Sequence, residues 1–130
     1  MFKGRILIVD DVELVLTGLQ RVFEGAAYYV RTTLSGKEAI EIVRNEHFDI
    51  VYTDMIMPEM NGVKLCKEIK SISPDTEVVL FSGTAHGVAK YQIEFIASGG
   101  REELLRKPLS KNEMLEVTEK ILEEMKEKRG

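Results

Sequence analysis

The sequence lacks several features that would place the protein in a specialised class. It contains a single cysteine, Cys66, so the chain cannot form an internal disulfide bond. No apolar run approaches the roughly 20 residues of a membrane-spanning helix. The N-terminal residues lead directly into a predicted strand and contain no secretory signal. We therefore expect a cytoplasmic protein without a membrane segment, and we interpret Cys66 as a small core residue.

An excess of basic residues is also lacking, because 18 lysines and arginines stand against 22 acidic residues, a net charge of −4. A nucleic-acid backbone is bound by a basic face, so we do not expect this domain to bind nucleic acid directly. Internal repeats and interdomain linkers are absent. The 130 residues fit a single domain over 1–130 with its core at about 5–125, and residues 126–130 are expected to fray or to lead into a linker.

Five apolar segments alternate with five segments of helical periodicity. The predicted strands cover residues 5–9, about 28–33, 50–54, 77–81 and 104–105. Ser35–Glu38 and Ser110–Glu113 match the capping box that opens a helix, and the fourth helical pattern lies within 84–100. This alternation indicates an α/β fold with a parallel sheet and helices on both faces.

Helical spacing also predicts which side chains face the core. In the first helix these are Leu14, Leu19, Val22 and Phe23. In the last helix they are Met114, Val117, Ile121, Leu122 and Met125.

The predicted strands end in polar side chains that suit one kind of chemistry. They are Asp10 and Asp11 after the first strand, Asp54 on the third, Ser82 after the fourth and Lys107 after the fifth. The carboxyl ends of parallel strands share one edge of the sheet, where α/β proteins place their ligand sites. Three adjacent carboxylates repel one another unless a cation joins them, and Mg²⁺ prefers oxygen ligands. Lys107 and Ser82 would suit the oxygens of a phosphoryl group.

Each of these residues also has an ordinary structural explanation. Asp10 and Asp11 could cap the first helix, because Asp is a favoured N-cap. Lys107 could be a surface lysine, Ser82 a turn residue, and Asp54 a solvated residue at a strand end. The coincidence of all five at strand ends favours a common site.

Four motifs at these spacings make the chain resemble the receiver domain of two-component response regulators, from Arg5 to about Met125. They are Ile8-Val9-Asp10-Asp11, Asp54 with Met57-Pro58-Glu59-Met60-Asn61-Gly62, Ser82-Gly83 and Lys107-Pro108. The resemblance implies a flavodoxin-like sandwich of five βα units, with a parallel sheet in strand order 2-1-3-4-5. It also implies that the peptide bond before Pro108 is cis.

The resemblance further implies a role for each site residue. Asp54 would accept a phosphoryl group from the phosphohistidine of a histidine kinase or from a phosphotransfer protein. Mg²⁺ or Mn²⁺ would be held by Asp10, Asp11, Asp54 and the backbone carbonyl of Ile56. Ser82 would bond a phosphoryl oxygen and Lys107 would neutralise its charge. Such a protein is a signalling switch and not an enzyme, since it catalyses only its own phosphorylation and dephosphorylation.

Phosphorylation would change the face formed by the helix within 84–100, the strand at 104–105 and the last helix. This face would regulate an effector, and it is also the face through which two copies would pair. Leu104 departs from the family pattern, which has Tyr or Phe three residues before the lysine. We therefore expect the phosphorylated state to be transmitted through movement of the backbone of residues 83–90. Tyr91 is a candidate to replace the missing aromatic side chain. The apolar side chain of Ile56, two residues after Asp54, predicts a long-lived phosphorylated form.

Three other functions fit part of the pattern. A receiver kept only as a docking module would be compatible with Leu104. A Mg²⁺-dependent aspartyl-phosphate phosphatase resembling the haloacid dehalogenase group would need an Asp-x-Asp motif after the first strand, where this chain has adjacent acids. A flavodoxin-type carrier would need a Ser/Thr/Gly-rich phosphate loop in place of Asp10-Asp11-Val12-Glu13.

Overall fold

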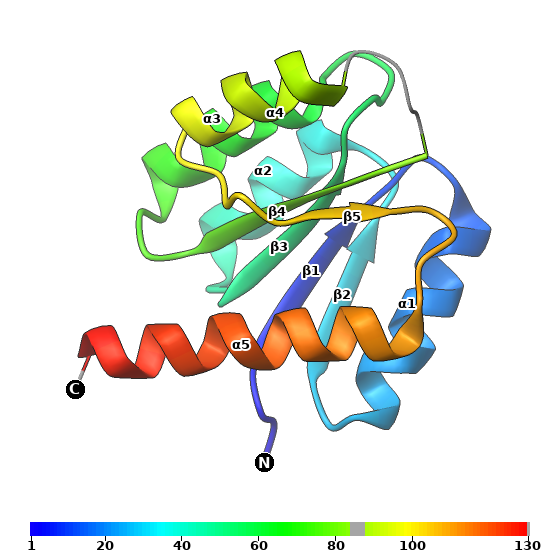
Figure 1. The fold of residues 1–130 in the computed structure, drawn as a ribbon, viewed down its shortest axis with the longest axis vertical. Coiled ribbons are helices and arrows are strands. Elements are labelled where there is room, and N and C mark those ends of the chain that lie inside the picture. The colour runs from blue at the N-terminus through cyan, green and yellow to red at the C-terminus, as the bar shows by residue number, and fades with distance from the viewer. Residues whose placement is uncertain (84–87, 130) are drawn as a thin grey trace.

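The computed structural model describes residues 1–83 and 88–129, in which five strands alternate with five helices (Figure 1). The strands are β1 Arg5–Val9, β2 Tyr29–Thr33, β3 Ile50–Asp54, β4 Glu77–Ser82 and β5 Leu104–Arg106. The helices are α1 Glu13–Gly25, α2 Gly36–Asn45, α3 Gly62–Ile72, α4 Val88–Ala97 and α5 Lys111–Arg129. None of the helices within the described residues has the length and apolar character needed to cross a bilayer.

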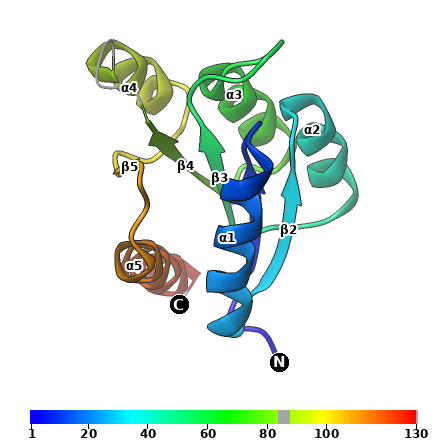
Figure 2. The ribbon, with the colours of Figure 1, turned by 90° about the vertical axis from the view of Figure 1, so that its right-hand side faces the viewer.

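The five strands form one parallel sheet in the order β2-β1-β3-β4-β5. The α/β fold and the strand order are therefore confirmed. Helices α1 and α5 cover one face of the sheet, and α2, α3 and α4 cover the other (Figures 1 and 2). The sheet is thus the middle layer of a three-layer sandwich, and the carboxyl ends of all strands lie at the same edge.

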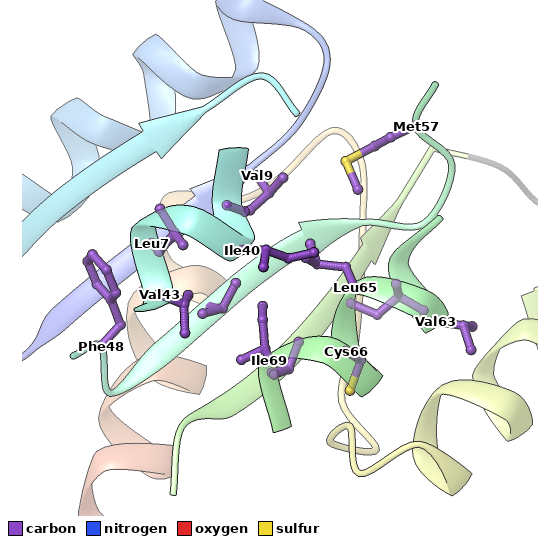
Figure 3. Packing of buried hydrophobic residues seen from close by; sticks show 14 of the residues in the cluster. Leu7, Val9, Ile40, Val43, Phe48, Met57, Val63, Leu65, Cys66 and Ile69 are labelled. Carbon is purple, nitrogen blue, oxygen red and sulfur yellow. The ribbon is translucent and has the colours of Figure 1, made fainter. Parts of the chain in front are cut away.

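Burial on both faces explains why the central strands are almost entirely apolar. Successive side chains of β1 alternate between the two faces: Leu7 and Val9 join the core beneath α2 and α3, whereas Ile6 and Ile8 join the core beneath α1 and α5. Figure 3 shows the first of these cores, which includes Cys66. Cys66 is fully buried as predicted, and burial raises the pKa of its thiol to about 11.

The sequence patterns predicted the helix boundaries more accurately than they predicted which side chains of each helix face the core. Leu14 is 84% exposed, and Leu16 takes the predicted inward position in α1. In α5, Thr118 is fully buried, whereas Val117 and Leu122 are only partly buried. Helix α5 continues to Arg129, and the expectation that the end of the chain frays or leads into a linker stays a prediction.

Side-chain caps open the helices at the predicted residues. The Ser35 hydroxyl accepts a hydrogen bond of 3.0 Å from the Glu38 N–H, and the Ser110 hydroxyl accepts one of 3.3 Å from the Glu113 N–H. The Glu38 carboxylate accepts a hydrogen bond from the Thr33 hydroxyl at 2.9 Å. This carboxylate therefore secures the end of β2.

Ion-pair networks occupy the opposite edge of the sheet, where the strands begin. The Arg101 guanidinium pairs with Glu77, Glu103 and Glu124, which connects β4, the start of β5 and α5. Hydrogen bonds from Arg101, and then from Lys120, lower the pKa of Glu103 to about 2. A second network joins Glu46 to Arg5 and Arg31 at the other end of this edge. The first network attaches α5 to the sheet, and the second attaches the end of α2 to β1 and β2.

Candidate functional site

The carboxyl ends of β1 and β3 bring the predicted acids together. The two strands are neighbours, and Val9 pairs with Thr53, so the following residues Asp10 and Asp54 meet at the same edge. One carboxylate oxygen from each of Asp10, Asp11 and Asp54 lies within 4.8 Å of the others. The acids therefore form one cluster, as their strand-end positions predicted.

The two oxygens of Asp10, a fully buried residue, have different surroundings. Oδ1 accepts a hydrogen bond of 2.8 Å from the backbone N–H of Val12. Oδ2 lies 2.8 Å from Nζ of Lys107 in an ion pair that lacks hydrogen-bond geometry, and it accepts no hydrogen bond from the described residues. Helix α1 starts after Val12 without a side-chain cap, so neither Asp10 nor Asp11 serves as its N-cap. A buried carboxylate oxygen with free acceptor capacity suits a cation.

Asp54 lies at the edge of the cluster, with 9% of its surface exposed. Its Oδ1 accepts a hydrogen bond of 2.9 Å from the Met55 N–H, and its Oδ2 lies 3.5 Å from Nζ of Lys107. Burial raises the pKa of Asp54 above its usual value; the charge of Lys107 opposes this rise and the charge of Asp10 adds to it. The Asp54 carboxylate is therefore poorly compensated in this structure.

Lys107 is attached to the neighbouring strand. Its backbone N–H donates a hydrogen bond of 2.9 Å to the carbonyl of Ser82, and its peptide bond to Pro108 is cis, as the resemblance implied. The Ser82 side chain is buried at the end of β4. Because Asp54 pairs with Phe81, Ser82 lies one residue beyond the end of β3. Ser82 and Lys107 thus lie at the same edge as the acids.

The loop after Asp54 folds back against the strand. The Gly62 N–H donates a hydrogen bond of 2.9 Å to the Met55 carbonyl, and a Cβ at position 62 would lie 2.9 Å from the carbonyl oxygen of Asp54. This close approach explains the glycine at the start of α3. Ile56, whose carbonyl is the fourth predicted ligand, has a side chain exposed in this loop.

Three groups near the site were not predicted from the sequence. The backbone N–H groups of Val12 and Met55 bind the two acids, and sequence cannot single them out because every residue except proline supplies this donor. The third is the ring of Phe81, over which Nζ of Lys107 lies at 5.3 Å from the centroid. The sequence feature that could have indicated this ring is the aromatic residue directly before Ser82.

A family comparison identifies this arrangement. The model of the response regulator receiver domain matches residues 6–119 of the chain. The chain belongs to this family. Two relatives carry the receiver with further sequence: the transcriptional regulatory protein ZraR of Escherichia coli K12 is 36% identical over 117 residues, and the response regulator SaeR of Staphylococcus aureus USA300 is 32% identical over 121 residues. The matches cover 90% and 93% of this chain but 26% and 51% of those relatives, so the chain spans about a quarter of the first and about half of the second.

Solved receiver structures have the same fold. A CheY-like receiver domain protein from Methanospirillum hungatei JF-1 has a TM-score of 0.89 and 26% identity, with 98% of both chains covered. A beryllofluoride-activated NtrC4 receiver domain dimer has a TM-score of 0.84 and 30% identity, with 93% of this chain and 98% of that chain covered. These matches agree with the topology of the sheet.

Leu104, where we predicted a departure from the family pattern, lies on β5, and Tyr91, the aromatic candidate for the readout, lies on α4. Leu104 and Tyr91 are both partly buried and pack against the core beneath α2 and α3. Position 104 therefore holds an aliphatic side chain that belongs to the core. Of the helical pattern predicted within 84–100, α4 covers Val88–Ala97. Residues 84–87, half of the predicted 83–90 readout loop and including Thr84, lie outside the described residues, and residues 88–90 form the start of α4.

Proposed function

We propose that this receiver domain is a phosphorylation switch in which Asp54 accepts a phosphoryl group from the phosphohistidine of a histidine kinase or of a phosphotransfer protein. The observation that carries the proposal is the cluster of Asp10, Asp11 and Asp54 facing Lys107 at the carboxyl edge of the sheet. We take residues 1–130 as a single receiver domain.

The proposed reaction uses a carboxylate oxygen of Asp54 as the nucleophile. This oxygen forms a bond to phosphorus while the bond between phosphorus and the imidazole nitrogen breaks, and the electron pair of that bond stays on the imidazole. The Met55 N–H orients the carboxylate by holding Oδ1. Lys107 supplies a positive charge close to Oδ2, and the Ser82 hydroxyl is proposed to donate a hydrogen bond to a phosphoryl oxygen.

The acids at this site fit Mg²⁺ or Mn²⁺. The side-chain donors are carboxylates alone, and the buried Oδ2 of Asp10 retains free acceptor capacity. We propose Asp10, Asp11, Asp54 and the carbonyl of Ile56 as ligands. When bound, such an ion neutralises negative charge on the transferring phosphoryl group. The ion would also stabilise the charged carboxylate of Asp54, whose pKa is raised by burial.

The proposed output surface consists of α4, β5 and α5. Phosphorylation is proposed to draw the loop after Ser82 towards Asp54 and so to move α4. Two exposed side chains of α4 support a protein contact there, since Ile93 is 70% and Ile96 is 44% exposed. We propose that an effector, or a second copy of the domain, binds this surface. The dimeric state of the activated NtrC4 receiver supports the second of these partners.

The proposal is tested by intact-mass measurement after incubation with Mg²⁺ and acetyl phosphate. We expect a gain of about 80 Da, the mass of one phosphoryl group, in the wild-type protein. The gain should be lost in Asp54→Asn and in EDTA. Asp75→Asn is the matched control, because Asp75 has an exposed side chain before β4, at the opposite edge of the sheet.

A mass gain that persists in Asp54→Asn would assign the phosphoryl group to another residue and refute the proposal. No gain from acetyl phosphate or from a purified phosphohistidine donor would favour the docking-module function instead. Leu104 is the observation that keeps this second function under consideration, because the family usually has an aromatic residue there.

A further inference from the structure

Three successive residues at the end of β4 hold different parts of Lys107. The Ser82 carbonyl accepts the Lys107 backbone N–H at 2.9 Å. A Cβ added to Gly83 would lie 3.5 Å from Cδ of Lys107, so the lysine stem runs along the backbone of Gly83. The ammonium lies over the ring of Phe81, with Nζ at 5.3 Å from the centroid. The lysine is therefore guided along its whole length.

The sheet fixes the position of Phe81. The residue is fully buried, and it pairs with Asp54 on β3 and with Leu105 on β5. Its carbonyl accepts a hydrogen bond of 3.2 Å from the Met55 N–H, the same group that holds Oδ1 of Asp54. The ring is thus a rigid support between the strand of the phosphoacceptor and the strand of the lysine.

Lys107 must serve two carboxylates at unequal distances. Its Nζ lies 2.8 Å from Oδ2 of Asp10 and 3.5 Å from Oδ2 of Asp54, and 22% of its side chain is exposed. An ammonium on a flexible four-carbon stem can turn towards solvent or towards the nearer carboxylate. An aromatic face within about 6 Å attracts the cation and so opposes both of these movements.

We propose that Phe81 is a positioning residue for phosphoryl transfer, whose ring holds the Lys107 ammonium beside Asp54. This inference rests on the proposed function of Asp54, and it assigns a role to a side chain that has no reactive group of its own. A leucine at position 81 would fill much of the same space without attracting the ammonium. The ring electrons, and not the volume of the side chain, should therefore determine the effect.

The first test replaces Phe81 site-specifically with mono-, di- and trifluorinated phenylalanine. Fluorination withdraws electrons from the ring face and changes the side-chain volume little. We expect the rate of phosphorylation by acetyl phosphate at saturating Mg²⁺ to fall stepwise, by about threefold to tenfold at trifluorophenylalanine. The Mg²⁺ concentration for half-maximal rate should stay unchanged. The same replacements at Phe23, a buried ring of α1 over which no described cation lies, are the control.

The second test does not require phosphorylation. In ¹H–¹³C NMR spectra of the unmodified protein, the Lys107 εCH₂ signal should be displaced upfield by the ring of Phe81. The Phe81→Leu variant should lose this displacement. In a double-mutant cycle, Phe81→Leu should lower the phosphorylation rate of the wild type but not that of Lys107→Ala.

The outcomes separate this inference from the proposed function. If the wild type gains no phosphoryl group, the proposed function fails, whereas the lysine NMR signal still reports whether the ring holds the ammonium. A normal rate across the fluorinated series, or an equal loss from Phe81→Leu with and without Lys107, would overturn the positioning role.

Discussion

At the scale of single residues, the carboxylate of Asp54 is held where its charge is costly. Its folded-state pKa is raised above the unfolded value, chiefly by burial, so the group disfavours folding at neutral pH. This penalty is relieved as the pH falls through the raised pKa, because the folded protein then takes up the proton.

We therefore expect Asp54→Asn to increase the free energy of unfolding at pH 7 in metal-free buffer by about 1 kcal/mol. Urea unfolding monitored by circular dichroism at a series of pH values measures this difference, which should shrink as the pH is lowered towards 4. Asp11→Asn is the control, since Asp11 belongs to the same cluster but is exposed and should give a smaller gain. A less stable Asp54→Asn protein would contradict the interpretation.

The sequence predicted which side chains meet at the site, and the reason is topological. Asp10, Asp54 and Lys107 each follow an apolar strand, and a parallel sheet brings such positions to one edge. The way in which they are held was not predictable. The ring of Phe81 and the N–H groups of Val12 and Met55 act through side-chain orientation and backbone geometry, which spacing does not encode.

At the scale of elements, a buried pair of hydroxyls connects β3 to α5. The Thr118 hydroxyl donates to the Met114 carbonyl at 2.7 Å, and the Tyr52 hydroxyl is hydrogen-bonded to the same Thr118 oxygen. Thr118 has only one hydroxyl proton, so Tyr52 must be the donor in the second bond. Two polar groups are thereby satisfied inside an apolar core.

Removal of the Thr118 hydroxyl should destabilise the protein more than removal of the Tyr52 hydroxyl. Thr118→Val leaves the Tyr52 hydroxyl buried without an acceptor, for which we expect a loss of about 2 kcal/mol, against about 1 kcal/mol for Tyr52→Phe. The double variant should lose less than the sum of the two. Equilibrium urea unfolding of the four proteins measures the coupling, and simple additivity would show that the bond contributes nothing.

Contacts with other elements explain why the predicted inner faces of α5 and α1 were partly wrong. A threonine on the inner face of α5 breaks the apolar pattern, and its partner is far away in sequence on β3. In α1, the apolar residues at 14 and 16 fit alternative helix faces, and only the packing against β1 and α5 selects Leu16.

At the scale of the whole molecule, the Arg101 network attaches α5 to the sheet and makes stability depend on pH. Glu103 has a folded-state pKa of about 2 against an ordinary value of 4.5, because Arg101 and then Lys120 stabilise its charged form. Its contribution is fully present above pH 4.5 and is lost as the pH falls towards 2.

We expect Arg101→Leu to lower the free energy of unfolding by about 2 to 3 kcal/mol at pH 7, because three partly buried carboxylates would lose their common partner. The loss of stability between pH 4.5 and 2 should also become shallower than in the wild type. Arg44→Leu is the matched control, since Arg44 pairs with Glu41 on the exposed surface and should change stability by about 0.5 kcal/mol or less. Equal losses from the two substitutions would refute the role of the network.

The two edges of the sheet thus make opposite contributions. The edge with Asp10 and Asp54 gathers like charges at a cost to folding, whereas the edge with Glu46 and Arg101 holds compensated ion pairs. Heat tolerance and signalling should accordingly be separable under mutation. In a library screened for thermal resistance, stabilising substitutions near the starts of the strands should leave the proposed phosphorylation intact. Stabilising substitutions at the carboxyl edge should remove an acid of the cluster and so abolish phosphorylation.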